Sequence, residues 1–90
     1  MRFMATDGAV EKLNRYQLTE FEVSQEALSR LEAEEKEDIG CIVLNWKNED
    51  LIILPVGKKT AIIFEYGKEI EGSYENLPII RYRDNHWSIA

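Results

Sequence analysis

The stretch SQEALSRLEAEEKEDIGCIVLNW, residues 24–46, decides the fold, because its residue pattern changes at Gly40. The part before Gly40 is acidic, with apolar residues at helical spacing, whereas residues 41–46 are mostly apolar. Short β-branched and aromatic runs, separated by turn residues, then continue to Ala90. Helices followed by strands predict a single α+β domain over residues 1–90.

Two helices are expected in the N-terminal half, after a short strand at Arg2–Ala5. Thr6 or Asp7 can cap the first helix, because each side chain can accept a hydrogen bond from a backbone N–H of the first turn. Ser24 can cap the second helix in the same way. The sequence between them, Leu18–Val23, mixes polar and apolar residues and is interpreted as extended.

The C-terminal half predicts an antiparallel sheet of five or six strands joined as a meander, with one or two helices packed on it. The expected strands after the N-terminal one are Ile39–Trp46, Leu51–Val56, Thr60–Tyr66, Glu69–Gly72, Leu77–Arg83 and His86–Ile89. Because Glu69–Gly72 is short and charged, it suits an edge strand. In the last strand, Trp87 and Ile89 are expected to face inward.

The charge of the chain limits the classes of molecule that we expect it to bind. Its net charge is −6, and its isoelectric point is about 4.8. Residues 1–40 carry ten acids and five bases, whereas residues 41–90 carry seven and six, so the excess lies in the helical half. This balance disfavours sequence-independent binding to nucleic acid, which needs clustered Lys and Arg. The chain is also short for an enclosed catalytic pocket.

The expected location is the cytoplasm. A single cysteine allows no intrachain disulfide and fits a reducing compartment. Neither a signal-peptide pattern nor an apolar run of membrane-spanning length is evident, so we expect a soluble protein without a membrane partner. Homodimerisation through a sheet edge stays open.

The acidic end of the second helix is the first candidate for a binding site. Its acids are Glu32, Glu34, Glu35, Glu37 and Asp38. They could contact a basic surface on another protein, where electrostatic attraction would speed association. Alternatively, they form a solvated helix end that keeps the protein soluble. With no catalytic motif present, the charge split favours a non-catalytic protein-binding domain: a small acidic inhibitor, immunity-type or regulatory protein.

A second hypothesis is a nucleic-acid-binding module. Aromatic and basic residues interleave on the strands, and such a sheet face holds single-stranded nucleic acid in small barrels. The residues that would form this face are Arg81, Tyr82, Arg83, Lys58 and Lys59. Acids are mixed among them in the sequence, which weakens this interpretation.

A third hypothesis is a small enzyme or metal carrier that uses Cys41 or His86. Cys41 lies in an apolar run and is interpreted as a core residue, and His86 as a strand residue beside a turn. No second cysteine, phosphate-binding glycine loop or Ser-His-Asp arrangement accompanies them. We therefore expect no enzyme activity, metal or cofactor.

Residues 1–13, with the run Thr6-Asp7-Gly8-Ala9-Val10-Glu11-Lys12-Leu13, resemble the opening strand and helix of A-type iron–sulfur carrier proteins. That family binds its cluster through a cysteine-glycine-cysteine group near the C-terminus. This chain ends Asn85-His86-Trp87-Ser88-Ile89-Ala90 and lacks that group. The resemblance would imply a carrier-like protein without the usual thiolate ligands, so no site residue is carried over from it.

Overall fold

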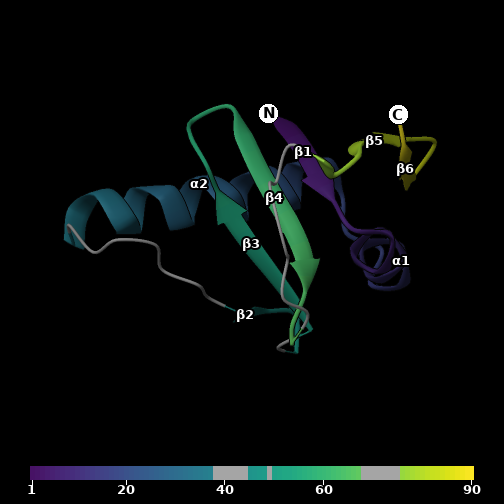
Figure 1. Cartoon of the computed structure of the whole chain (residues 1–90), viewed down its shortest axis with the longest axis horizontal. Helices are drawn as coiled ribbons and strands as arrows, with labels where there is room; N and C mark the ends of the chain where they lie inside the picture. The colour runs from purple at the N-terminus through teal and green to yellow at the C-terminus, as the bar shows by residue number, and fades with distance from the viewer. Residues whose placement is uncertain (38–44, 49, 68–75) are drawn as a thin grey trace.

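The computed structural model describes residues 1–37, 45–48, 50–67 and 76–90, and of residues 34–37 and 45 it describes the backbone alone. The described helices and strands form one structure that is built around a single sheet (Figure 1). In chain order the elements are β1 (Arg2–Ala5), α1 (Asp7–Arg15), α2 (Glu20–Glu37), β2 (Asn45–Trp46), β3 (Leu51–Pro55), β4 (Thr60–Glu65), β5 (Ile79–Arg83) and β6 (His86–Ile89). The expected α+β class is confirmed.

The sheet is mixed, so the prediction of an antiparallel meander is only partly right: β2, β3 and β4 follow it, as does the β5–β6 pair, but β1 and β4 are parallel. The strand order is β2-β3-β4-β1-β5-β6 among the described residues. β1 runs parallel to β4, with Phe3 beside Ala61, and antiparallel to β5, with Phe3 beside Ile80. The first strand therefore lies in the centre and separates β4 from β5. Its core-facing residues Phe3 and Ala5 are both buried, whereas Arg2 on the other face is exposed.

The first helix forms as the sequence predicts. Thr6 is its N-cap, and the Thr6 hydroxyl accepts a hydrogen bond from the backbone N–H of Ala9 at 3.2 Å. Asp7 lies in the first turn, where a negative charge suits the helix dipole. The helix ends at Arg15, and Gln17 then adopts a left-handed conformation with φ of 54°.

The second helix begins earlier than predicted. Thr19 and Glu22 form a capping box, in which the Thr19 hydroxyl accepts from the Glu22 N–H at 3.2 Å and the Glu22 carboxylate accepts from the Thr19 N–H at 3.0 Å. Leu18 and Val23 flank this box and are both buried, as in a hydrophobic staple. The expected extended segment Leu18–Val23 and the Ser24 cap are therefore wrong, since both lie at or within the helical start.

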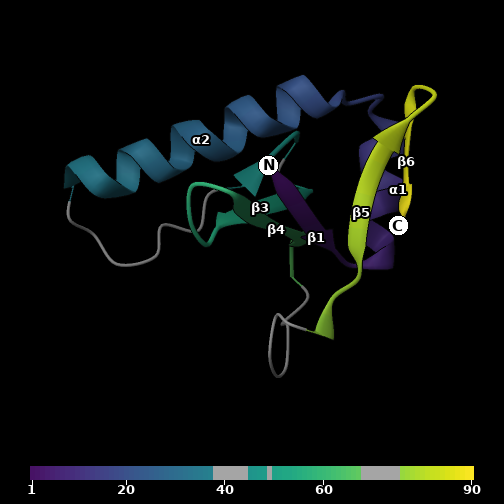
Figure 2. The same cartoon turned by 90° about the horizontal axis from the view of Figure 1, so that it is seen from above.

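One apolar core joins both helices to the same face of the sheet. It contains Phe3, Ala5, Ala9, Leu13, Leu18, Val23, Ala27, Leu51, Ile53, Ala61, Ile63, Ile80 and Trp87. Figure 2 shows α2 beside β3 and α1 beside β6, which agrees with the contacts of these elements. Ile52, Leu54 and Ile62 are buried outside this cluster, so β3 is apolar on both faces.

The C-terminal hairpin matches its prediction in part. Asp84 and Asn85 both have positive φ, 53° and 64°, which is the geometry of a two-residue type I′ turn. Trp87 is buried as expected, but Ile89 is 53% exposed and does not face the core. The strand predicted at Glu69–Gly72 lies outside the described residues, as does most of Ile39–Trp46.

Candidate functional site

Five basic side chains gather at one end of the sheet, which we call the basic end. They are Arg2 at the start of β1, Lys58 and Lys59 in the β3–β4 turn, and Arg81 and Arg83 on β5. All five are exposed. Figure 1 shows the β3–β4 turn and the start of β1 at the same end of the molecule. The structure therefore unites residues from three distant segments of the chain.

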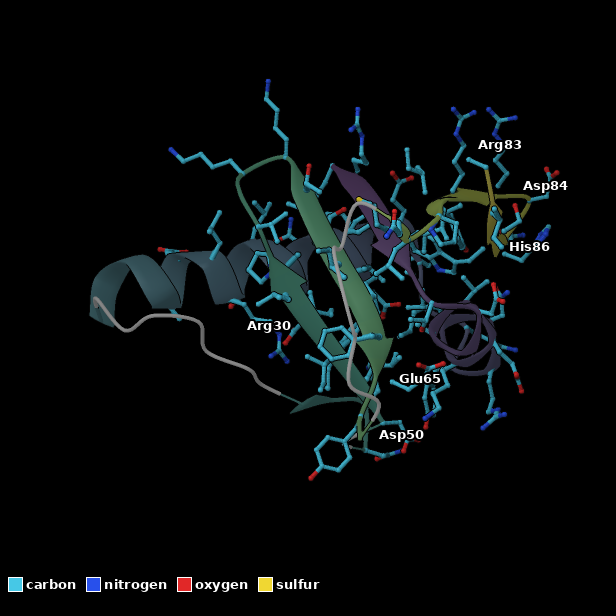
Figure 3. All side chains as sticks on the ribbon, in the orientation of Figure 1. Arg30, Asp50, Glu65, Arg83, Asp84 and His86 are labelled. Carbon is cyan, nitrogen blue, oxygen red and sulfur yellow. The ribbon has the colours of Figure 1, made fainter. Side chains whose placement is uncertain are left out.

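Figure 3 shows that the labelled Arg83 and the labelled acids Glu65 and Asp50 lie at opposite ends of the molecule. Arg83 lies among other nitrogen-tipped side chains along the upper edge, whereas Glu65 and Asp50 lie at the opposite, lower end. The four basic residues named for the nucleic-acid hypothesis all belong to the basic end, and the structure adds Arg2 to them. Arg2 escapes the sequence analysis because only the pairing of β1 with β4 and β5 reveals its neighbours.

Arg2 and Arg81 flank the end of the β1–β5 pairing. Phe3 and Ile80 form the last pair of that register, and Arg2 and Arg81 are the residues directly beyond it. On the other side of β1, the backbone N–H of Arg2 donates to the carbonyl of Lys59 at 2.7 Å, which holds the β3–β4 turn against β1. Both arginines line the same hollow, and like charges gathered at one surface repel each other unless an anion lies nearby.

The surface of the basic end is concave. Two adjoining hollows of about 410 Å³ and 590 Å³ share Met1 and Arg2 in their walls. The smaller is also lined by both β5 arginines, Tyr82 and Glu20, and the larger by both lysines of the turn. Both hollows are open to solvent, so a ligand would lie along this surface rather than be enclosed in it.

Tyr82 forms part of the wall of the smaller hollow. Its ring is half-buried and packs on Trp87, with ring centroids 5.2 Å apart and planes tilted by 55°. The Trp87 indole N–H donates to the carbonyl of Leu18 at 2.7 Å, so this ring pair is fixed to the core. Trp87 is therefore the core residue that was expected, and Tyr82 borders the smaller hollow from the core side of β5, on the opposite face of the strand from Arg81 and Arg83.

No ion pair joins a residue of the basic end to any acid in the described part of the chain. The ion pairs found there are Arg15 with Glu11 at 2.8 Å and Arg30 with Glu26 at 2.9 Å, both within helices. An acidic protein thus leaves five cations at one end without a described counterion. This is the clearest electrostatic feature of the described surface.

The acidic end of α2 forms a separate surface. Glu34, Glu35 and Glu37 lie on the last turns of the helix, but their side chains are outside the described residues, as is the whole of Asp38. Glu32 is exposed. Figure 1 shows that the C-terminal part of α2 extends beyond the strands. The predicted acids therefore share one projecting helix end, with Asp38 left untested.

Sequence reasoning misses an apolar stripe on the outer face of α2. Phe21 is 72% exposed and Leu28 is 41% exposed. Residues seven apart lie on the same helix face, and Glu32, four residues beyond Leu28, continues it. The signal is present in the Thr19-x-x-Glu22 capping pattern, which places Phe21 inside the helix.

The residues of the third hypothesis are not brought together within the described structure. Cys41 lies outside the described residues. His86 is exposed and pairs with Arg83 across the β5–β6 hairpin, as Figure 3 shows. Within residues 1–37, 45–48, 50–67 and 76–90 no group of three or more His, Cys, Asp or Glu residues is placed to hold a metal ion.

A polar contact joins the end of α1 to the β2–β3 turn. The Tyr16 hydroxyl donates a hydrogen bond to the Asp50 carboxylate, and the Lys12 ammonium approaches the Asp50 carbonyl at 3.4 Å. The hydrogen bond to Asp50 favours the protonated phenol and raises the pKa of Tyr16 above its ordinary value of 10.0. Because this contact fastens a helix to a turn, we assign it to stability rather than to chemistry.

Glu65 is a buried carboxylate against the first turn of α1. It is only 5% exposed, and a Cβ added to Gly8 would fall 1.5 Å from its Oε1 atom. Gly8 is therefore required for this close approach. The position also suits a negative charge, because the N-terminal end of a helix is electropositive.

Comparisons of the chain with protein-family models, with curated proteins and with solved structures found no match. Neither described helix combines the length and the apolar character needed to cross a membrane.

Proposed function

We propose that this chain is a non-catalytic protein-binding domain of the inhibitor, immunity or regulatory kind, which docks through the outer face of α2. The observation that carries the proposal is the exposed pair Phe21 and Leu28, which leads along one helix face into the acidic end. Large apolar side chains on a helix face are frequent anchors in protein interfaces.

The inner face of α2 supports this assignment. Val23, Ala27 and Arg30 are buried, and they already attach the helix to the rest of the protein. The outer stripe and the projecting end are therefore not needed for the core. A partner with an apolar groove bordered by basic residues would complement both, and the acids would accelerate its approach.

The test is affinity capture from a lysate of the source organism, followed by purification of the captured protein and titration calorimetry. Two variants probe the surface: Phe21→Ala with Leu28→Ala, and Glu34→Lys with Glu35→Lys and Glu37→Lys. The matched control is Val56→Ala with Ile89→Ala, which removes two other exposed apolar side chains.

We expect the captured protein to bind the control as it binds the wild type. Loss of Phe21 and Leu28 should weaken binding by about tenfold or more, since truncated anchors typically lose over 1 kcal/mol each. Charge reversal should chiefly slow association. Equal binding by all variants would contradict the proposal.

A further inference from the structure

We propose that the basic end binds the phosphate backbone of single-stranded nucleic acid. This surface is distinct from the outer face of α2, so the inference does not depend on the protein-binding function. It concerns Arg2, Lys58, Lys59, Arg81 and Arg83 and the two hollows that they line.

The first argument is electrostatic. Arg2 and Arg81 lie directly beyond the last pair of the β1–β5 register and line the same hollow, and neither has an ion-pair partner among the described residues. Two exposed guanidinium groups that border one hollow repel each other. A phosphate between them removes the repulsion, and each guanidinium can donate two parallel hydrogen bonds to its oxygens.

The second argument is the shape of the basic end. Its cations follow the sheet from the β3–β4 turn, across β1, to β5, and neighbouring strands are about 4.8 Å apart. The cations therefore form a row that crosses neighbouring strands. A single flexible strand can lay successive phosphates along such a row, and its bases can enter the adjoining hollows.

The third argument is the aromatic residue at the smaller hollow. Tyr82 lines this hollow together with Arg81 and Arg83. Its half-buried side chain alternates with theirs along β5 and packs on Trp87, so it borders the hollow from the core side. A base that enters the hollow could contact the exposed part of this ring, a contact that an acidic peptide would not use.

Two acids limit the affinity. Glu20 lines the smaller hollow, and Asp84 follows Arg83 directly in the hairpin turn. The net charge of −6 also repels a polyanion at long range. Binding should therefore depend strongly on salt, and measurements belong at low ionic strength first.

The experiment is a fluorescence-anisotropy titration of a labelled single-stranded oligothymidylate and an RNA of equal length, at several salt concentrations. The test variant is Arg81→Gln with Arg83→Gln, and a second is Arg2→Gln with Lys59→Gln. The control is Arg15→Gln with Lys47→Gln, which changes the net charge equally at exposed positions outside the basic end. Thermal unfolding checks that each variant is folded.

We expect salt-dependent binding by the wild type and the control within twofold of each other. Each test variant should bind about tenfold or more weakly, and its logarithmic salt slope should fall by roughly 0.7 for each phosphate that the variant no longer neutralises. A polyglutamate of equal charge should compete poorly. The proposal is overturned by absence of binding at the lowest salt, by an equal loss in the control, or by polyglutamate that binds as tightly as the oligonucleotide.

Discussion

The side-chain amide of Asn14 forms hydrogen bonds with both the N–H and the carbonyl of the Trp87 backbone. Asn14 Nδ2 donates to the Trp87 carbonyl at 2.9 Å, and Asn14 Oδ1 accepts from the Trp87 N–H at 2.6 Å. β6 is an edge strand of the described sheet, so this amide occupies the place of a neighbouring strand. It attaches α1 to the sheet and covers groups that could otherwise pair with another chain.

Replacing Asn14 with alanine should therefore destabilise the fold. Both backbone groups of Trp87 would lose their partner, and we expect a loss of about 1–3 kcal/mol in the free energy of unfolding, measured by urea denaturation. Asn76→Ala, at an exposed position, serves as the control. If both variants lose the same stability, the amide clamp has no special role.

Replacing Gly8 with alanine should displace the Glu65 side chain. The added Cβ would lie 1.5 Å from Glu65 Oε1 and 2.5 Å from its Cδ, so the carboxylate must move. Overpacking of this kind costs about 1–3 kcal/mol, whereas Gly57→Ala, with nothing within 4 Å of its Cβ, should be nearly neutral. Adding Glu65→Ala to Gly8→Ala should show strong coupling in a double-mutant cycle. Strict additivity would refute the steric account.

Replacing Thr19 with alanine should lower stability by about 1 kcal/mol, because the capping box is lost. Ser24→Ala should be neutral or slightly stabilising, since alanine is the better residue inside a helix. Chemical denaturation of the two variants decides which residue caps the helix. The reverse order would restore the start expected from the sequence.

At alkaline pH, deprotonation of the Tyr16 hydroxyl should lower the free energy of unfolding. Its pKa is raised in the folded state by the hydrogen bond to Asp50, so its contribution is complete below pH 10.0 and is lost as pH rises through the folded-state pKa. Tyr16→Phe should remove this part of the alkaline destabilisation, whereas Tyr66→Phe, at an exposed position, should leave it. Unfolding midpoints measured on either side of pH 10 test this, and an unchanged profile in Tyr16→Phe would exclude the assignment.

Local signals account for much of the fold. The Thr6 cap and the Asp84-Asn85 turn depend on residues within a few positions of one another, and Thr6 is one of the two caps that the sequence predicts. The start of α2 is also encoded locally, in Thr19 and Glu22, but Ser24 offers a competing cap signal five residues later. A helix that started at Ser24 would leave Phe21 outside it, so the exposed helical position of Phe21 does not follow from that signal.

The place of β1 cannot be derived in the same way. Arg2 pairs with Thr60 and Phe3 with Ile80, and such distant pairings leave no short-range pattern. The basic end cannot be derived from short-range patterns either, because its residues come from three separated segments. Their residue types suggest a nucleic-acid face, but only the strand order brings Arg2 and the β3–β4 turn to the β5 arginines.

The central position of β1 has a consequence for biosynthesis. β4 and β5 have no direct pairing with each other in the described sheet, so β1 alone joins the three strands on one side to the two on the other. The ribosome makes β1 first, but its second partner, β5, begins only at Ile79. Until then one edge of β1 has no native strand to pair with, and the nascent chain depends on slow, long-range closure to complete its sheet.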